Sequence, residues 1–311
     1  MPAPTKTQGA TRFHTPAKIT PILRVGVLRD DGFHDVSLVM VPVSLYDILE
    51  WIPGAATLNL QVESGEQLGA PGQNLVLRAA QAFARTTGRA LLGTLHLRKA
   101  IPSAAGLGGG SGNAAGTLLL LNQVHGEPLR GGQLETMALE LGSDVPFFLH
   151  PRPCWAGGRG ERLEPLADYP TLWLLVVKPP LAIATAEAYH VVDHSRAAAA
   201  TQAARRLSIP GAGSPRPALT SVEQVVQALA NDFEAALLPL HPELGWAKQA
   251  LLQAGALGAM LTGSGSALFG VFGDARSRDV AARTLTVPPG WNVLPCRTLA
   301  GHDYGVEPVP S

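Results

Sequence analysis

The 311-residue chain is poor in cysteine, in aromatic residues and in charge of either sign. Its two cysteines, Cys154 and Cys296, belong to no C-x-x-C pair and to no cluster with histidine, which excludes the common zinc spacings and a disulfide framework. Lysine plus arginine and aspartate plus glutamate both number 24, so the formal net charge is zero. Non-specific nucleic-acid or anionic-membrane binding usually needs a basic excess, so we expect neither nucleic acid nor membrane as a partner.

Long hydrophobic runs are also missing. No uncharged apolar stretch comes near a bilayer-spanning length of about 18 residues. Residues 1–18 lack the apolar segment of a signal peptide, so we expect a cytoplasmic protein. The hydrophobic content of 46% and the length of the chain suffice for a large core and suggest one large domain or, in preference, two domains that share a cleft.

Apolar periodicity predicts a chain that mixes strands and helices. The predicted strands are 17–52 with a turn at Asp31-Gly32, 57–64, 91–102, 171–177, 258–262, 267–272 and 292–297. The predicted helices are 74–88, a helix that ends near 126, 133–142, 221–238, 242–254 and 276–286. Residues 1–15 are predicted as a loosely attached arm and 195–220 as a surface loop. This mixture, without a regular βαβ repeat, favours the α+β class.

Glycine is unusually dense in PSAAGLGGGSGNAA, residues 102–115. A strand, a glycine loop and a helix start form an arrangement that binds phosphate, because backbone N–H groups converge on the anion and the helix dipole favours it. The Walker A pattern fails because no lysine follows the glycines. The dinucleotide pattern G-x-G-x-x-G fails because Ser111 occupies its third glycine position. The alternative is a tight turn that packs a helix.

This stretch resembles the phosphate loop of the GHMP kinases, the superfamily named for galactokinase, homoserine, mevalonate and phosphomevalonate kinases. The resemblance implies ATP and Mg²⁺ as cofactors and identifies no metal ligand in the chain. NLVLRAA (74–80) is similar to a family segment that places Asn74 near the nucleotide base. The implied loop contacts are Pro102, Gly106, Leu107, Gly108, Gly109, Gly110, Ser111, Gly112 and Asn113. Gly112 replaces a serine common in the family, so we expect the loop's amides, more than its side chains, to bind the phosphates.

Two other segments carry the catalytic residues that the resemblance implies. TPAKIT (15–20) is similar to the family's Ala-Lys-(Ile/Leu)-Asn, with Lys18 as the lysine and Thr20 in place of the asparagine. LGSDVPFFL (141–149) resembles the segment with the catalytic aspartate, here Asp144. Asp144 would be the general base, and Lys18 would orient it and stabilise negative charge. Taken alone, Lys18 also fits a solvated surface lysine and Asp144 a turn or helix-cap residue.

The contacts to the acceptor substrate are implied by shorter matches. Within the superfamily, the loop most resembles that of kinases whose acceptor is a cytidine diphosphate-linked sugar alcohol of isoprenoid biosynthesis. Phe33 and Tyr189 would stack on the cytosine ring, a contact worth ~1–3 kcal/mol per base. His34 would hydrogen-bond the edge of the base, and Thr185 matches a threonine of the family. The two aromatic residues equally suit a hydrophobic core.

A second glycine turn lies in MLTGSGSALFGVF (260–272), which matches the third motif of the family. Its residues Gly263, Ser264 and Gly265 would close over the transferred phosphoryl group or the substrate. The alternative is a glycine corner between two strands.

The resemblance implies the two-domain α+β fold of the GHMP kinases. Residues 1–157 would form the ATP-binding half, similar to the second domain of ribosomal protein S5, and residues 158–311 a ferredoxin-like half. The expected activity is transfer of phosphate from ATP to the 2-hydroxyl of a small-molecule acceptor, by a monomer or a weak homodimer. Two alternatives stay open: another small-molecule GHMP kinase, such as a homoserine kinase, and a non-catalytic S5-like binding protein.

Overall fold

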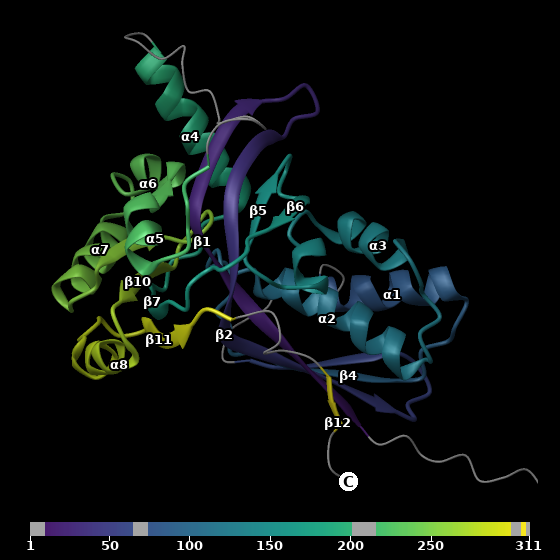
Figure 1. Cartoon of the computed structure of the whole chain (residues 1–311). Helices are drawn as coiled ribbons and strands as arrows, with labels where there is room; N and C mark the ends of the chain where they lie inside the picture. Colours follow the sequence, from purple (N-terminus) through teal and green to yellow (C-terminus); the bar gives the residue numbers. More distant parts are fainter. Residues whose placement is uncertain (1–9, 65–73, 201–215, 300–305, 309–311) are drawn as a thin grey trace, which may run out of the picture.

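A long β-hairpin runs through the middle of the molecule, as the computed structural model shows (Figure 1). The structure describes residues 10–64, 74–200, 216–299 and 306–308. Strands β1 (Thr11–Leu28) and β2 (His34–Pro53) pair antiparallel around the predicted Asp31-Gly32 turn. Because both strands are long, one hairpin contributes to the core on either side of it.

The larger sheet is built on this hairpin. In the described part of the chain its strand order is β12-β1-β2-β4-β3, with β5 and β6 attached through β2 and β8 through β1. The added strands are β3 (Asn59–Glu63), β4 (Gly93–Arg98), β5 (Cys154–Gly157), β6 (Arg162–Pro165), β8 (Ala230–Asn231) and β12 (Val306–Pro308). Three helices lie beside this sheet (Figure 1): α1 (Leu75–Thr87), α2 (Gly109–Val124) and α3 (Gln133–Leu141).

A second, antiparallel sheet forms the other half. Its strand order is β11-β7-β10-β9, from β7 (Trp173–Lys178), β9 (Gly258–Leu261), β10 (Leu268–Phe272) and β11 (Asn292–Arg297). The helices of this half are α4 (Thr185–Ala200), α5 (Val222–Ala228), α6 (Asp232–Leu237), α7 (Pro242–Gln253) and α8 (Ala275–Thr284). The two sheets with their helices confirm the α+β class. The domain boundary at 157/158 stays a prediction.

Most predicted elements are present, and their ends follow the expected local chemistry. Helix α1 begins where the Asn74 side chain accepts a hydrogen bond from the Val76 amide at 2.9 Å. It ends at Gly88, whose φ of +66° is the left-handed conformation that glycine adopts without a steric penalty.

Three predictions need correction. The arm predicted for 1–15 is wrong from Thr11 onward, because β1 already pairs with β2 and β12 there and buries Phe13; residues 1–9 lie outside the described residues. The loop predicted for 195–220 is wrong at its start, since α4 continues to Ala200; residues 201–215 lie outside the described part.

The single helix predicted for 221–238 is divided into α5 and α6 by the short strand β8. Asn231 causes the break. Its amide nitrogen donates to the Leu261 and Gly263 carbonyls, and its oxygen caps α6 at the Phe233 amide. Asn231 therefore both begins α6 and joins it to the 261–263 segment.

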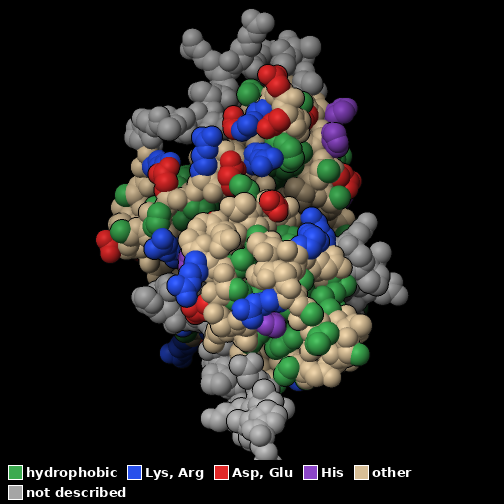
Figure 2. Space-filling model, turned by 90° about the vertical axis from the view of Figure 1, so that its right-hand side faces the viewer, with side chains coloured by type: hydrophobic (Ala, Val, Ile, Leu, Met, Phe, Trp, Pro, Cys, Tyr) green, Lys and Arg blue, Asp and Glu red, His purple; other side chains and the backbone are tan. Residues whose placement is uncertain are grey.

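The surface and the core agree with the balanced composition. On the face shown in Figure 2, basic and acidic side chains are interspersed among apolar and neutral ones. Cys154 and Cys296 are free thiols, and burial raises the pKa of each to about 12. Among the described residues, no helix has the length and apolarity required to cross a membrane.

Candidate active site

A cavity of about 550 Å³ opens where the two glycine turns meet. It brings together most of the predicted site residues from segments far apart in the sequence. Those that line it are Lys18, Asn74, Pro102, Gly106, Leu107, Gly108, Gly109, Gly110, Ser111, Asn113, Asp144, Thr185, Tyr189, Gly263, Ser264 and Gly265. The predicted residues Phe33, His34 and Gly112 are not among its lining residues.

The glycine loop is glycine-rich partly because other parts of the protein approach it closely. Gly106 has a φ of +72°, and a Cβ there would lie 2.0 Å from the Thr262 carbonyl oxygen. Gly108 has a φ of +71°, and its Cβ would meet the Phe148 ring at 2.7 Å and the Lys18 side chain at 3.0 Å. Both positions therefore exclude any larger residue, whether or not a ligand is bound.

The loop leads into the start of α2 in the way the phosphate-binding prediction requires. Gly108 is the residue before the helix, and no side chain caps the first amides of α2. Gly110 and Ser111, in the first turn, face the cavity. Uncapped amides together with the positive end of the helix dipole favour an anion at this place.

Close packing explains why glycine occupies position 112, where the family commonly has serine. A Cβ at Gly112 would lie 3.1 Å from the Pro16 carbonyl oxygen of β1, so α2 packs closely against the hairpin there. Gly112 supplies close packing, and the cavity is lined by its neighbours.

Lys18 and Asp144 form an ion pair inside the cavity. The Lys18 ammonium nitrogen is 3.9 Å from Oδ2 of Asp144. Lys18 is only 5% exposed, whereas the Asp144 side chain is 39% exposed. Burial lowers the pKa of Lys18 below its usual 10.5, and the attraction of the Asp144 carboxylate partly opposes that shift.

Thr20, which replaces the family's asparagine, orients the lysine. Its hydroxyl accepts a hydrogen bond from Lys18 Nζ at 3.1 Å. Its backbone amide donates to the Thr262 hydroxyl at 3.1 Å, and that hydroxyl contacts the Gly106 carbonyl at 3.3 Å. Through Thr20 and Thr262, Lys18 is thus joined to the glycine loop.

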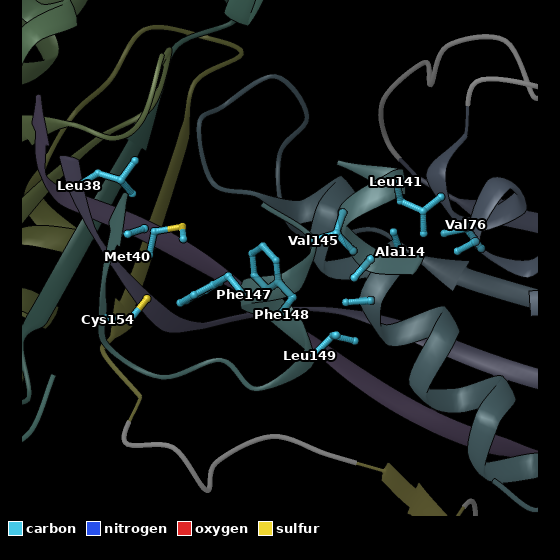
Figure 3. Close-up of a cluster of buried hydrophobic side chains, with 14 of the residues drawn as sticks. Leu38, Met40, Val76, Ala114, Leu141, Val145, Phe147, Phe148, Leu149 and Cys154 are labelled. Carbon is cyan, nitrogen blue, oxygen red and sulfur yellow. The ribbon is translucent and has the colours of Figure 1, made fainter. Parts of the chain in front are cut away.

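Asp144 is held at the cavity edge by the apolar residues that follow it. Pro146–Leu149 form a short 3₁₀ helix. In Figure 3, Val145, Phe147, Phe148 and Leu149 lie together among the buried apolar side chains. Because these side chains are buried in the core, the carboxylate that precedes them has a defined position beside Lys18.

The second glycine turn lies against the first. A Cβ on Gly263 would be 3.2 Å from both the Gly106 carbonyl oxygen and Lys18 Nζ. The Ser264 hydroxyl lies 3.2 Å from that of Thr185, at the start of α4. The turn thus joins the second half of the chain to the lysine and the glycine loop, beyond its role as a corner between β9 and β10.

The predicted acceptor residues adopt an arrangement that differs from a simple Phe33–Tyr189 pair. Tyr189 stacks on His34, with ring centres 4.8 Å apart and planes at 16°. His34 Nε2 is 2.9 Å from Oδ1 of Asp193. Phe33 is 49% exposed, and the guanidinium carbon of Arg159 lies 4.7 Å from the centre of its ring. The cytosine sandwich stays a prediction.

The sequence did not predict two charged groups, one in the cavity wall and one beneath the glycine loop. Arg159, in the turn between β5 and β6, lines the cavity. Asp47 lies fully buried beneath the glycine loop and binds Lys99 and Asn113. Neither belongs to a recognisable motif, although a lone aspartate in an apolar strand segment was a signal for Asp47.

The arrangement provides the parts of a phosphoryl-transfer site. It has an amide-lined anion site, a buried cation and a partly exposed carboxylate that can accept a proton. The described residues contain no group of three or more histidine, cysteine or acidic side chains that could hold a metal ion.

Comparison with known proteins shows that most of the chain is similar to kinases of one family. Residues 74–152 match the model described as "GHMP kinases N terminal domain", and residues 216–286 match "GHMP kinases C terminal". The 4-diphosphocytidyl-2-C-methyl-D-erythritol kinase of Syntrophus aciditrophicus is 37% identical over 292 residues, which cover 92% of this chain and 98% of the relative. The kinase of the same name from Anaeromyxobacter dehalogenans is 41% identical over 297 residues, 92% of this chain and 90% of the relative.

A solved structure extends the likeness to the fold. The crystal structure of a 4-(cytidine 5'-diphospho)-2C-methyl-D-erythritol kinase superposes with a TM-score of 0.75 at 30% sequence identity. The match covers 93% of this chain and all of that chain. The likeness therefore includes both halves of the molecule.

Proposed function

Because this chain belongs to the GHMP kinases, and within them to the 4-diphosphocytidyl-2-C-methyl-D-erythritol kinase family, we propose that it phosphorylates the 2-hydroxyl of that compound with ATP. The observation that carries this proposal is the Lys18–Asp144 pair at the glycine-lined cavity. The relatives and their shared fold supply the substrate class.

Asp144 is the proposed general base. Its carboxylate accepts the proton of the attacking hydroxyl while the oxygen forms a bond to the γ-phosphorus of ATP. The bond between that phosphorus and the bridging oxygen breaks, and ADP leaves with the bonding electron pair. The partial exposure of Asp144 lets the acceptor hydroxyl reach it, and the packed Val145 segment keeps it in place.

Lys18 and the glycine loop are proposed to hold the charge. The lysine ammonium, buried beside both glycine turns, stabilises negative charge that develops during transfer. The amides at the start of α2 bind the phosphates of ATP. Asn74 and Pro102 line the same cavity, on the side proposed for the nucleotide.

Mg²⁺ is proposed to enter with ATP. This hard cation is commonly held by one or two protein oxygens together with substrate phosphates and water, so it needs no cluster of acidic residues. The Ser111 hydroxyl, on the cavity wall in the first turn of α2, is an oxygen ligand that suits it. When bound, the ion neutralises charge on the phosphates.

The acceptor is proposed to lie near Tyr189, His34 and Arg159. Among the described residues, Lys18, Lys99 and Arg159 are the cations of the cavity wall. Lys18 and Lys99 each face a carboxylate, whereas the described ion pairs do not include Arg159, whose guanidinium rests on the Phe33 ring. An arginine so placed suits the diphosphate of the acceptor.

A substrate panel tests this function. Purified protein with ATP and Mg²⁺ is expected to release ADP with 4-diphosphocytidyl-2-C-methyl-D-erythritol and to yield its 2-phosphate, identified by mass and ³¹P NMR. Homoserine and mevalonate serve as competing acceptors. Turnover of homoserine instead would support another GHMP kinase, and no turnover of any acceptor would support a non-catalytic binding protein. A cytoplasmic location and a monomeric or weakly dimeric state stay predictions.

A further inference from the structure

Asp47, in the second half of β2, is a fully buried carboxylate that accepts four hydrogen bonds. Its Oδ1 accepts from the backbone amides of Ala100 at 2.7 Å and Ile101 at 2.8 Å. Its Oδ2 accepts from Lys99 Nζ at 2.5 Å and from Asn113 Nδ2 at 2.8 Å. A buried charge is costly without such partners, so each donor is held closely in place.

These donors lie on both sides of the glycine loop. Residues 99–101 follow β4 and lead into the loop, while Asn113 is in the first turns of α2, after it. Oδ1 of Asn113 accepts a hydrogen bond from the Thr15 hydroxyl at 2.6 Å, and the side-chain nitrogen Nδ2 is thereby directed at Asp47. One carboxylate of the central hairpin therefore joins the entry and the exit of the loop.

Lys99, one of the donors to Asp47, places a positive charge at the start of α2. Its ammonium nitrogen is 3.2 Å from the position of a Cβ on Gly109, at the very start of α2, and the residue lines the cavity. The positive end of a helix dipole repels a cation. Asp47 compensates that repulsion and so keeps a positive charge beside the amides proposed to bind phosphate.

We propose that Asp47 is a positioning residue for the nucleotide. It acts through Lys99 and Asn113, by keeping the ammonium group at the start of α2 and the two ends of the glycine loop at a fixed separation. This inference rests on the proposed function, since it assigns the loop to ATP.

Asp47→Asn keeps one of the two carboxylate oxygens as an acceptor and replaces the other by an NH₂ group. The amide oxygen still accepts from the Ala100 and Ile101 amides, but the NH₂ group confronts two donors, Lys99 and Asn113. We expect the KM for ATP and the Kd for ADP, measured by calorimetry, to rise about tenfold, with kcat and the acceptor KM within about twofold. Lys99→Met in the Asp47→Asn background is expected to weaken ADP binding less than Lys99→Met alone, because the two act together.

The control is Asp274→Asn, which removes the carboxylate that caps α8 outside the cavity wall. It is expected to lower stability without any change in ADP affinity. If Asp47→Asn lowers the melting temperature and leaves ADP affinity and the KM for ATP at the wild-type values, Asp47 is a structural residue and the inference is overturned.

Two further variants keep the test decisive if Asp47→Asn does not fold. Lys99→Met and Asn113→Ala each remove one donor to Oδ2, and each is expected to weaken ADP binding; unchanged affinity in both would reject the proposal. Failure of the proposed function is a separate result, because wild-type protein would then not phosphorylate the cytidyl acceptor. Binding of ADP would still report on Asp47 in that case.

Discussion

The Lys18 ammonium and the Asp144 carboxylate lie 3.9 Å apart, with the lysine buried and the aspartate partly open to the cavity. Because of this difference in exposure, the two side chains suit different chemical roles. A buried cation is suited to stabilise charge, and an accessible carboxylate is suited to receive a proton from a substrate.

Replacing Asp144 by asparagine tests the general base. The amide keeps the shape of the side chain but cannot accept the proton, so kcat is expected to fall by about 10²–10⁴ with little change in either KM. Steady-state kinetics with both substrates varied give the three constants. A variant that retained near-normal kcat would remove Asp144 from this role, and Asp274→Asn serves as a carboxylate control outside the cavity wall.

Lys18 makes stability depend on pH in a defined direction. Because burial lowers its pKa in the folded protein below the usual 10.5, the unfolded chain binds more protons between the lowered value and about 10.5, and stability from this group rises with pH there. Lys18→Met abolishes the titration. Urea unfolding from pH 7 to 10 is therefore expected to show the stability of the wild type rising relative to that of Lys18→Met. A constant difference across this range would contradict the buried, paired lysine.

Alanine is expected to affect stability at Gly106 but not at Gly110, in the first turn of α2. Gly106→Ala places a residue with a positive φ and a Cβ that collides with the Thr262 carbonyl oxygen. It should reduce the free energy of unfolding by about 1–3 kcal/mol or more. At Gly110 the nearest atom to a new Cβ is Leu75 Cδ1 at 3.6 Å, so Gly110→Ala should fold as well as the wild type.

The second effect of Gly110→Ala is on the nucleotide. Its methyl group lies on the wall of the cavity, so the KM for ATP is expected to rise while chemical denaturation shows unchanged stability. Equal effects of both substitutions on stability would contradict the close approach at Gly106.

Arg159→Met tests the proposed grip on the acceptor diphosphate. A hydrogen bond to a charged group contributes about 1.5–3 kcal/mol, so the acceptor KM should rise about tenfold or more while the KM for ATP stays unchanged. Binding of CDP and of cytidine distinguishes the diphosphate from the base: the variant should lose affinity for CDP and keep that for cytidine. Arg85→Met, in the last turn of α1, is the matched control. Equal losses for both ligands would place Arg159 at the base instead.

The local elements were largely readable from sequence because their signals are local. Asn74 and Gly88 delimit α1 by capping chemistry, and the Asp31-Gly32 turn separates two apolar strands. The extension of β1 to Thr11 was missed because its pairing partners are far away in the sequence. The division between α5 and α6 was missed for the same reason, since Asn231 is held by carbonyls of the 261–263 segment.

The sequence by itself determined the chemistry available to this protein: a glycine loop before a helix, a lysine in a strand and an aspartate before an apolar run. Those signals depend on neighbours along the chain. Tertiary structure alone decided that Thr20 orients Lys18, that Gly106 yields to the Thr262 carbonyl, and that Asp47 joins both ends of the loop. The contacts of Gly106 and Asp47 join segments that lie far apart in the sequence, and the contact of Thr20 depends on the direction that the Lys18 side chain takes in the packed protein. Residue spacing along the chain encodes neither the approach of distant segments nor that direction.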